Sequence, residues 1–379
     1  MLQFFKKKWW VALPLLLIFL GLTYWLIGKI QYRLNVVDVE DYAPVSTLKV
    51  AEHHPTQAKF PFIDVHNHQF TMPIQNLEKL VNEMDELNMK VMVNLSGFRG
   101  KYLEWSLDNV NEHYGNRFVL FMNIDFEQLD DEGWPNETLL MMEEAVKQGV
   151  KGLKVYKNLG LSETDNEGNR IAVDDPRLDP IWAKCGALGI PVLIHTGEPA
   201  AFWKPKDKFN ERWLELKQYP SRYKDPEKNP SFEEVMSEQH NVFRKHPETK
   251  FINAHLGWFG NDLARLGKLF DELPNVYTEI GAVLAELGRQ PVTAREWLIR
   301  YQDRVLRGKD TYKKTEYYTY FRVLETSDEY FDYYRKRHAH WKMYGLALPD
   351  SVLKKIYYKN AMEVIPGIEK TLFETVGQH

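Results

Sequence analysis

Six residues of types that bind metal ions or move protons stand at the ends of short apolar segments: His66, His68, Lys154, His195, His255 and Asp310. His66 and His68 are two positions apart, so on an extended strand both side chains point to the same side and can chelate one ion. Neutral imidazole and carboxylate are ligands that divalent metals accept. The pattern therefore predicts a divalent-metal site of the kind that hydrolases use.

A single histidine at a strand end is more often a hydrogen-bonded structural residue, and only the combination indicates a metal site. The remaining histidines show the contrast. We expect a surface position for those in the predicted linker or on predicted helices: His53, His54, His113, His240 and His246. His338 and His340 repeat the spacing of the first pair, but no apolar strand carries them. We therefore predict no metal there.

Composition narrows the classes of protein. The 379 residues are 44% hydrophobic and 27% charged, which is typical of a chain with a large core. The net charge is −4 and no long basic tract is present, so nucleic-acid binding is not indicated. The single cysteine, Cys185, excludes an internal disulfide and a cysteine-rich metal site, and we expect it in the core. A metal must then use histidine, carboxylate or modified lysine.

Eight apolar segments rich in β-forming residues predict strands that could position these side chains. They are Phe62–His68, Val91–Leu95, Phe118–Asp125, Val150–Tyr156, Val192–Thr196, Phe251–Leu256, Val276–Ile280 and Arg304–Asp310. Helical periodicity separates them, for example at residues 76–89, 138–148 and 232–246. The alternation predicts an α/β fold of the (β/α)8 TIM-barrel type, whose active sites lie at the carboxyl ends of the strands. A doubly wound sheet is the alternative, but no glycine-rich phosphate loop follows His68.

The N-terminal region has a different character. Residues 9–28 contain no charged residue, and a helix of that length crosses the hydrocarbon core of a bilayer. Aromatic residues lie near both ends, and Lys6, Lys7 and Lys8 precede it, which favours a cytoplasmic N-terminus. Lys29 and Arg33 weaken that bias. A cleaved signal peptide is the rival interpretation, but its apolar region would be shorter and end in an A-x-A-like site.

We therefore expect a single-pass protein of the cell membrane with a periplasmic catalytic domain. Residues 1–30 would form the cytoplasmic stub and transmembrane anchor, residues 31–59 a juxtamembrane linker, and residues 60–379 the catalytic barrel.

The segments FIDVHNH, GLKVYKNLG, LIHTGEP, AHLG and DRVLRGKDT resemble the successive strand motifs of the amidohydrolase superfamily. The resemblance is to the amidohydrolase-related branch that includes metal-dependent decarboxylases, and it covers about residues 60 to 367. It implies that His66, His68, His195 and Asp310 bind a metal ion, with Asp310 also handling protons. His255 would then act on the substrate side.

Lys154 leaves the number of ions open. Its segment resembles the part of urease that carries a carboxylated lysine bridging two metals, which would make the site binuclear. Alternatively, a cationic Lys154 binds a substrate carboxylate beside one ion, and we favour one ion. Zinc is the expected metal for a histidine-rich site with one carboxylate, while manganese and iron remain open.

The last strand departs from the family pattern. The family usually has a small or apolar residue followed by Gly-Thr-Asp or Gly-Ser-Asp, whereas this chain has Arg307, Gly308, Lys309 and Asp310. Strand alternation turns Arg307 and Lys309 away from the side that Asp310 shares with Gly308. Both cations would face the outer helices and need acidic partners or solvent there.

Residues 197–230 form a long aromatic connection that could act as a lid over a small-molecule substrate, or only pack on the barrel. We expect substrate contacts from Trp203, Lys204 and Glu279, and from Glu198 unless it caps a turn. The predicted activity is hydrolysis of an amide, cyclic amide, ester or lactone. A decarboxylase or related lyase and a tethered non-catalytic homologue are the alternatives. The sequence does not indicate an oligomeric state.

Overall fold

The computed structural model describes residues 9–374, and the chain divides into two compact units, Met1–Val50 and Ala51–His379. The first unit contains helix α2 (Trp9–Leu34), and within Val11–Leu34 a stretch of 18 residues has a mean hydropathy of 2.2 and is not buried. The predicted apolar helix is thus present and extends six residues beyond Gly28. Its length and composition suit a membrane span, and a signal sequence has the same character. The predicted role of Lys6, Lys7 and Lys8 lies outside the described residues.

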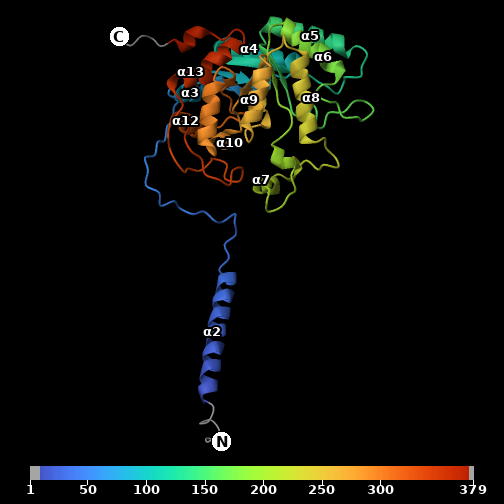
Figure 1. Ribbon diagram of the computed structural model, residues 1–379. Helices are drawn as coiled ribbons and strands as arrows, with labels where there is room; N and C mark the ends of the chain where they lie inside the picture. Colours follow the sequence, from blue (N-terminus) through green and yellow to red (C-terminus); the bar gives the residue numbers. More distant parts are fainter. Residues whose placement is uncertain (1–8, 375–379) are drawn as a thin grey trace, which may run out of the picture. The chain divides into compact units, whose positions relative to one another are not determined.

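The second unit is a barrel of eight parallel strands paired in sequence order (Figure 1). The strands are β1 (Phe62–Asn67), β2 (Met89–Asn94), β3 (Phe118–Asn123), β4 (Gly152–Val155), β5 (Val192–Ile194), β6 (Phe251–Asn253), β7 (Val276–Glu279) and β8 (Val305–Leu306). The backbone amides of Val65 and Asp310 donate to the carbonyls of Arg307 and His66, at 2.9 and 2.7 Å. These bonds join the last strand region to the first. The TIM-barrel prediction is confirmed, and the doubly wound alternative is wrong.

Helices surround the strands: α3 (Leu77–Leu87), α4 (Gly100–His113), α5 (Trp134–Gln148), α6 (Asp179–Ala187), α7 (Trp213–Gln218), α8 (Phe232–Lys245), α9 (Leu263–Glu272), α10 (Leu284–Gly288), α11 (Pro291–Arg300), α12 (Lys314–Glu325), α13 (Asp350–Lys354) and α14 (Asn360–Val364). The three helices predicted from periodicity are α3, α5 and α8. Asn76 caps α3, and a capping box of Ser231 and Glu234 starts α8, since these side chains satisfy amide groups that the first turn leaves open.

Alternation along the strands creates two apolar layers. Ile63, Val65, Val91, Val93 and Leu193 belong to an inner cluster, whereas Phe62, Met92 and Val192 belong to the larger cluster packed against the helices. Cys185 is buried there as expected, and burial raises the pKa of its thiol. Each buried methylene contributes about 0.8 kcal/mol, so these two layers fix the strand ends firmly.

Two sequence expectations need correction. Strand β6 ends at Asn253, and His255 lies in a following turn (η5, Ala254–Trp258) with a φ of 58° rather than on the strand. His240 and His246 are buried rather than exposed. His240 packs against Phe243 and Phe259, and His246 bonds to Asp179 at 3.0 Å, because their helix turns that face toward the barrel.

Candidate metal centre

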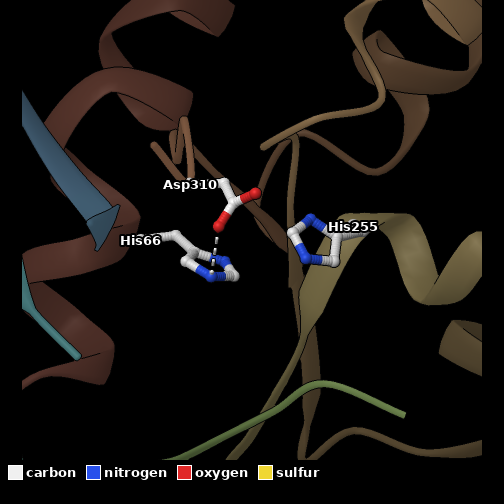
Figure 2. Close-up of side chains that lie close together, drawn as sticks. All are labelled: His66, His255 and Asp310. Carbon is white, nitrogen blue, oxygen red and sulfur yellow. Dashed lines mark ion pairs between the residues drawn. The ribbon is translucent and has the colours of Figure 1, made fainter. Parts of the chain in front are cut away.

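The first strand delivers a histidine pair to the carboxylate of Asp310. The Nε2 atoms of His66 and His68 both lie 3.6 Å from Oδ1 of Asp310. Candidate ligand atoms of His66, His255 and Asp310 all lie within 4.8 Å of one another, and Figure 2 shows these three side chains together. Residues from β1, the turn after β6 and the segment after β8 thus meet at one point. The predicted common orientation of His66 and His68 is confirmed.

Hydrogen bonds fix which ring nitrogen of these histidines is available. Nδ1 of His66 donates to Glu279 Oε1 at 3.0 Å, and Nδ1 of His255 donates to the carbonyl of Gly281 at 2.8 Å. Because a carboxylate and a carbonyl only accept, both Nδ1 atoms carry hydrogen and both Nε2 lone pairs are free. His68 Nδ1 is paired with the Ser96 hydroxyl at 2.7 Å. Metal-bound histidines are held by such bonds on the second ring nitrogen.

Burial keeps the rings of His66, His68 and His195 neutral, as metal ligation requires. It lowers the pKa of His66 and His195 well below the ordinary value, and that of His68 to about 4. Within the part of the chain that the structure describes, the buried Nε2 atoms of His66 and His195 have no hydrogen-bond partner. Unpaired buried nitrogen is costly in a folded protein, so this arrangement fits a bound cation. The donor set therefore suits a metal ion.

His195 joins the group from the end of β5. Its ring centroid lies 4.4 Å from that of His255, and the two rings meet edge to face. His255 also stacks on His66 at 4.8 Å. The structure thus brings a ligand atom of His255 within 4.8 Å of one on Asp310, although the sequence placed His255 on the substrate side.

Lys154 is buried at the end of β4 with its ammonium group unpaired. Nζ has no hydrogen-bond partner and lies 5.4 Å from the ring centroid of Tyr156. Burial lowers the pKa of Lys154 to about 7, although Asp310 and Glu279 oppose the shift. The position is compatible with both predicted roles, a modified ligand and an anchor for a substrate carboxylate.

Asp310 is the most accessible member of the group. Its side chain is 30% exposed, compared with 0% for His66 and 1% for His255. Burial would raise its pKa, but the surrounding His66, His255 and His68 outweigh this and lower it. Its φ of 82° lies in the left-handed region, which a residue other than glycine adopts at a cost. That backbone conformation, held by the bond to the His66 carbonyl, aims the carboxylate at the histidines.

Glu279 lies beneath the cluster instead of on a pocket wall. Its carboxylate is fully buried and accepts from the His66 ring, from the amide of His255 at 2.7 Å and from the amide of Gly281. A Cβ atom on Gly308 would lie 2.2 Å from Glu279 Oε2, and one on Gly281 would lie 2.6 Å away. Glycine at these two positions gives the carboxylate its space. The expected direct substrate contact of Glu279 does not fit this placement, because protein groups already surround its oxygens.

The other expected substrate residues are placed differently. Glu198 pairs with Lys157 Nζ at 2.5 Å. Trp203 and Lys204 line a cleft of about 480 Å³ between the β5–α8 and β6–α9 connections, and none of the clustered histidines lines it. Trp203 donates to the Pro230 carbonyl at 2.8 Å. The long aromatic connection is ordered, with short helices at Ala200–Trp203, Trp213–Gln218 and Pro220–Arg222.

Sequence reasoning missed the partners that hold the site. Tyr156 stacks on His68 and its hydroxyl is 3.0 Å from Ser96 Oγ, while Trp258 packs against His195 and His255. Lys157 was missed as the partner of Glu198. Tyr156 and Lys157 directly follow Lys154 and Val155, so their position at the end of β4 was the available signal.

Arg307 and Lys309, the two residues after β8 that depart from the family pattern, have the predicted orientation. Lys309 Nζ bonds to Glu316 on α12 at 2.6 Å, which supplies the expected acidic partner. Arg307 is fully buried, and among the described residues its three nitrogens have no hydrogen-bond partner. Its guanidinium instead lies 3.6 Å from the ring centroid of Phe62, with Phe321, Tyr317, Tyr357 and Tyr320 within 5.8 Å. An aromatic cage therefore takes the place of hydrogen-bonding groups, and the nearby acid is the buried Asp64, whose pKa the charge of Arg307 lowers against the effect of burial.

Comparison with known proteins agrees with this architecture. A family model described as amidohydrolase matches residues 51–366. A structure of 2,6-dihydroxybenzoate decarboxylase with 2,6-dihydroxybenzoate is 14% identical, with a TM-score of 0.51, covering 83% of this chain and 99% of its own. A Staphylococcus aureus protein assigned to the amidohydrolases is 16% identical, with a TM-score of 0.51, covering 81% and 99%. No curated protein matches the chain. Likeness at these identities shows a shared fold.

Proposed function

The chain belongs to the amidohydrolase family, and on that premise we propose that it is a metal-dependent hydrolase of a small molecule. The bond cleaved would be an amide, cyclic amide, ester or lactone. One observation carries the proposal. Histidine rings held through Nδ1 present free Nε2 atoms to a point that they share with Asp310. A merely structural cluster would pair those nitrogens.

His66, His68 and Asp310 would hold the ion, together with His195 or His255. When bound, a divalent ion would polarise a carbonyl and lower the pKa of water to about 7. Zinc is the proposed metal, because imidazole with one carboxylate suits it. Glu279 would position His66 through the bond to Nδ1 and so keep Nε2 directed at the ion.

Asp310 is the proposed proton carrier. Its carboxylate is accessible and its lowered pKa keeps it ionised, so it can accept a proton from the attacking water and return it to the leaving group. His255, if it does not bind metal, would orient the scissile carbonyl through Nε2. We propose that the Lys157–Glu198 pair, rather than Trp203 and Lys204, contacts the substrate. Trp203 and Lys204 line a cleft to which none of the clustered histidines contributes.

Asp310→Asn tests the reaction, and Asp125→Asn is its matched control. Asp125 also follows a strand end, but it pairs with Arg99 away from the histidines. We expect the wild-type protein to bind about one divalent ion and Asp310→Asn to lose at least about a hundredfold in kcat, since proton transfer contributes that much. Asp125→Asn should keep kcat. Wild-type protein that cannot be loaded with any divalent metal would refute the proposal.

A decarboxylase is the second candidate, and the unpaired ammonium of Lys154 favours it. A buried cation without a partner suits a substrate that carries a carboxylate. Assays of amides, lactones and aromatic carboxylates for new acid or for carbon dioxide separate the two reactions. Carbon dioxide from a carboxylate, with no hydrolysis of any amide or lactone, would establish the lyase.

Lys154→Met distinguishes one ion from two. With one ion, the variant should keep its metal content and raise the KM for a carboxylated substrate at least about tenfold, as expected for a lost charge pair. With a carboxylated lysine between two ions, the metal content of the variant should fall from two ions to one or none. Elemental analysis of both proteins gives the answer. A tethered homologue without catalysis would show metal binding and no turnover.

We further propose that α2 is an uncleaved anchor, with the barrel on the periplasmic side and residues 31–59 as the linker. Residues 9–28 of this helix carry no charge, and a helix of that length crosses about 30 Å of hydrocarbon. N-terminal sequencing of the mature protein, with carbonate extraction of membranes, tests this. A mature chain that begins after Leu34 would identify a cleaved signal peptide instead.

A further inference from the structure

Two segments far apart in the sequence form a cationic surface on the second unit. Tyr219 and Arg222 in the β5–α8 connection, and residues 335–338 after α12, line an open cleft of about 330 Å³. We call this surface the basic rim. The first segment belongs to the β5–α8 connection and the second to the α12–α13 connection, and Figure 1 shows the one with α7 projecting from the barrel. The reaction proposed above uses none of these residues.

A buried carboxylate joins the two sides of the rim. Glu215 on α7 is 2% exposed and bonds to Arg222 at 2.5 Å, while His338 Nδ1 lies 3.3 Å from the same oxygen. The rings of Tyr219 and His338 meet at 6.4 Å. The rim is therefore a built surface, in which two connections are held together by a shared anion.

The charged residues of the two segments are mainly positive. Residues 204–224 contain seven lysines and arginines against three acidic residues, and one of each, Arg212 and Glu215, is buried in a shared ion pair. Arg335, Lys336 and Arg337 follow one another on the other side, and Lys336 and Arg337 are exposed. With a net charge of −4 for the whole chain, this concentration of cations is local. It matches an anionic partner in charge.

Exposed aromatic side chains accompany the cations. Phe209 directly follows Lys208 and is 82% exposed, with the Lys208 ammonium 5.0 Å from its ring, and Tyr219 is 40% exposed. Aromatic rings beside lysine and arginine are the combination that settles at the headgroup level of a bilayer. A soluble anion would be served by the cations alone.

We propose that the basic rim docks the barrel on the anionic lipid headgroups of the membrane that holds its own N-terminal helix. Residues 35–50 separate α2 from the second unit, a tether of at most roughly 55 Å when extended. Such a tether keeps the rim at high effective concentration near the membrane. The inference rests on the proposed anchor and is independent of the reaction, because its tests measure binding alone.

The full chain is reconstituted in nanodiscs of phosphatidylcholine, or of equal parts phosphatidylcholine and phosphatidylglycerol. We expect slower amide hydrogen exchange in residues 204–224 and 335–338 in the anionic discs alone. In a second arm, a protease site in residues 41–50 is cut after reconstitution in vesicles of the same compositions. The released domain should stay on the anionic vesicles, leave the neutral ones, and dissociate in high salt.

Lys208→Glu with Lys336→Glu is the test variant. Each reversal should lower vesicle binding at least roughly fivefold, because each basic residue near an anionic surface contributes measurably. Lys147→Glu with Lys268→Glu makes the same change of charge at exposed positions on α5 and α9 and should bind as the unaltered protein does. This control distinguishes an effect of charges on the basic rim from an effect of the net charge of the protein.

Equal protection and equal retention on neutral and anionic lipid would overturn the proposal. Release of the cut domain by millimolar inorganic phosphate, but not by sodium chloride of equal ionic strength, would show that the cleft binds a free phosphate group and would also overturn it. Equal loss of binding in the control pair would reduce the rim to general charge attraction, against the proposal. Loss of catalysis with intact binding would affect only the proposed function.

Discussion

The segment after β8 has an inner face toward the histidines and an outer face toward the helices, and buried polar groups are stabilised differently on the two faces. On the inner face, Asp310 meets histidines whose free nitrogens, with Lys154 Nζ, have no hydrogen-bond partner. On the outer face, Arg307 also lacks hydrogen bonds, but five aromatic rings surround it. Lys309 beside it has Glu316 as a partner.

The comparison distinguishes two kinds of buried polar group without a hydrogen bond. Some can bind a ligand, and others are already stabilised by protein contacts. Aromatic faces stabilise a guanidinium through their quadrupoles, so Arg307 needs no further partner. Imidazole nitrogens that converge on a carboxylate have no such compensation, and a cation would supply it. The inner face should therefore respond to substitution through metal binding, and the outer face through stability.

Gly308→Ala should have the largest effect, because it affects the inner face most directly. Its Cβ would lie 2.2 Å from Glu279 Oε2 and 2.8 Å from His66 Cβ, so both side chains must shift. We expect metal affinity and kcat/KM to fall at least about a hundredfold, as displacement by about 1 Å does in active sites. Chelator competition measures the affinity.

Gly115→Ala is the control for Gly308→Ala, because its Cβ meets nothing closer than the Asn111 side chain at 3.3 Å. It should bind metal normally. Unchanged metal affinity in Gly308→Ala would break the proposed link between Glu279, His66 and the ion.

Arg307→Met tests the outer face. Burial raises the pKa of Asp64, and the charge of Arg307 opposes that rise. Removing the guanidinium leaves the buried carboxyl group of Asp64 without this nearby cation. We expect the free energy of unfolding to fall by about 3 kcal/mol, typical of a buried charge that loses its counter-charge. Denaturant titration measures this. The folded variant should keep metal affinity, and a metal-free but stable variant would show that the two faces are coupled.

Glu279→Gln on the inner face and Glu316→Gln on the outer face allow a direct comparison of the two faces. The first weakens the acceptor for His66 Nδ1, and the second weakens the partner of Lys309. We expect Glu279→Gln to bind metal about tenfold to a hundredfold more weakly. High metal concentration should restore its activity. Glu316→Gln should bind metal normally. Equal metal affinities in the two variants would contradict the positioning role of Glu279.

The smallest effect concerns pH and lies away from both faces. Burial, with Arg244 and Arg265, lowers the pKa of His240 to about 4 from 6.5. Between these values the unfolded chain binds the proton more readily, so stability is retained above pH 6.5 and lost as pH falls toward 4. At about pH 5 the loss should be about 1–2 kcal/mol.

His240→Phe should remove this part of the acid sensitivity, and His113→Gln, at an exposed position, should leave it. Denaturant titrations at about pH 5 and about pH 8 compare the three proteins. An acid loss in His240→Phe as large as in the unaltered chain would contradict the assignment to His240.

The sequence by itself predicted the barrel, because eight apolar segments alternate with helical periodicity and no glycine-rich phosphate loop follows the first of them. It also placed His66, His68, His195 and Asp310 together, since strand ends of a barrel converge. Strand alternation predicted the outward orientation of Arg307 and Lys309 correctly. These inferences needed only local pattern and the geometry of parallel strands.

Only the tertiary structure decided how those residues are held. The bond from the His255 amide to Glu279, the bond from the His66 ring to Glu279 and the packing of Arg307 on Phe62 each join residues more than 20 positions apart. The burial of His240 depends likewise on packing against Phe259. No local pattern encodes these contacts, because they depend on which side chains of neighbouring strands and helices meet once the barrel closes.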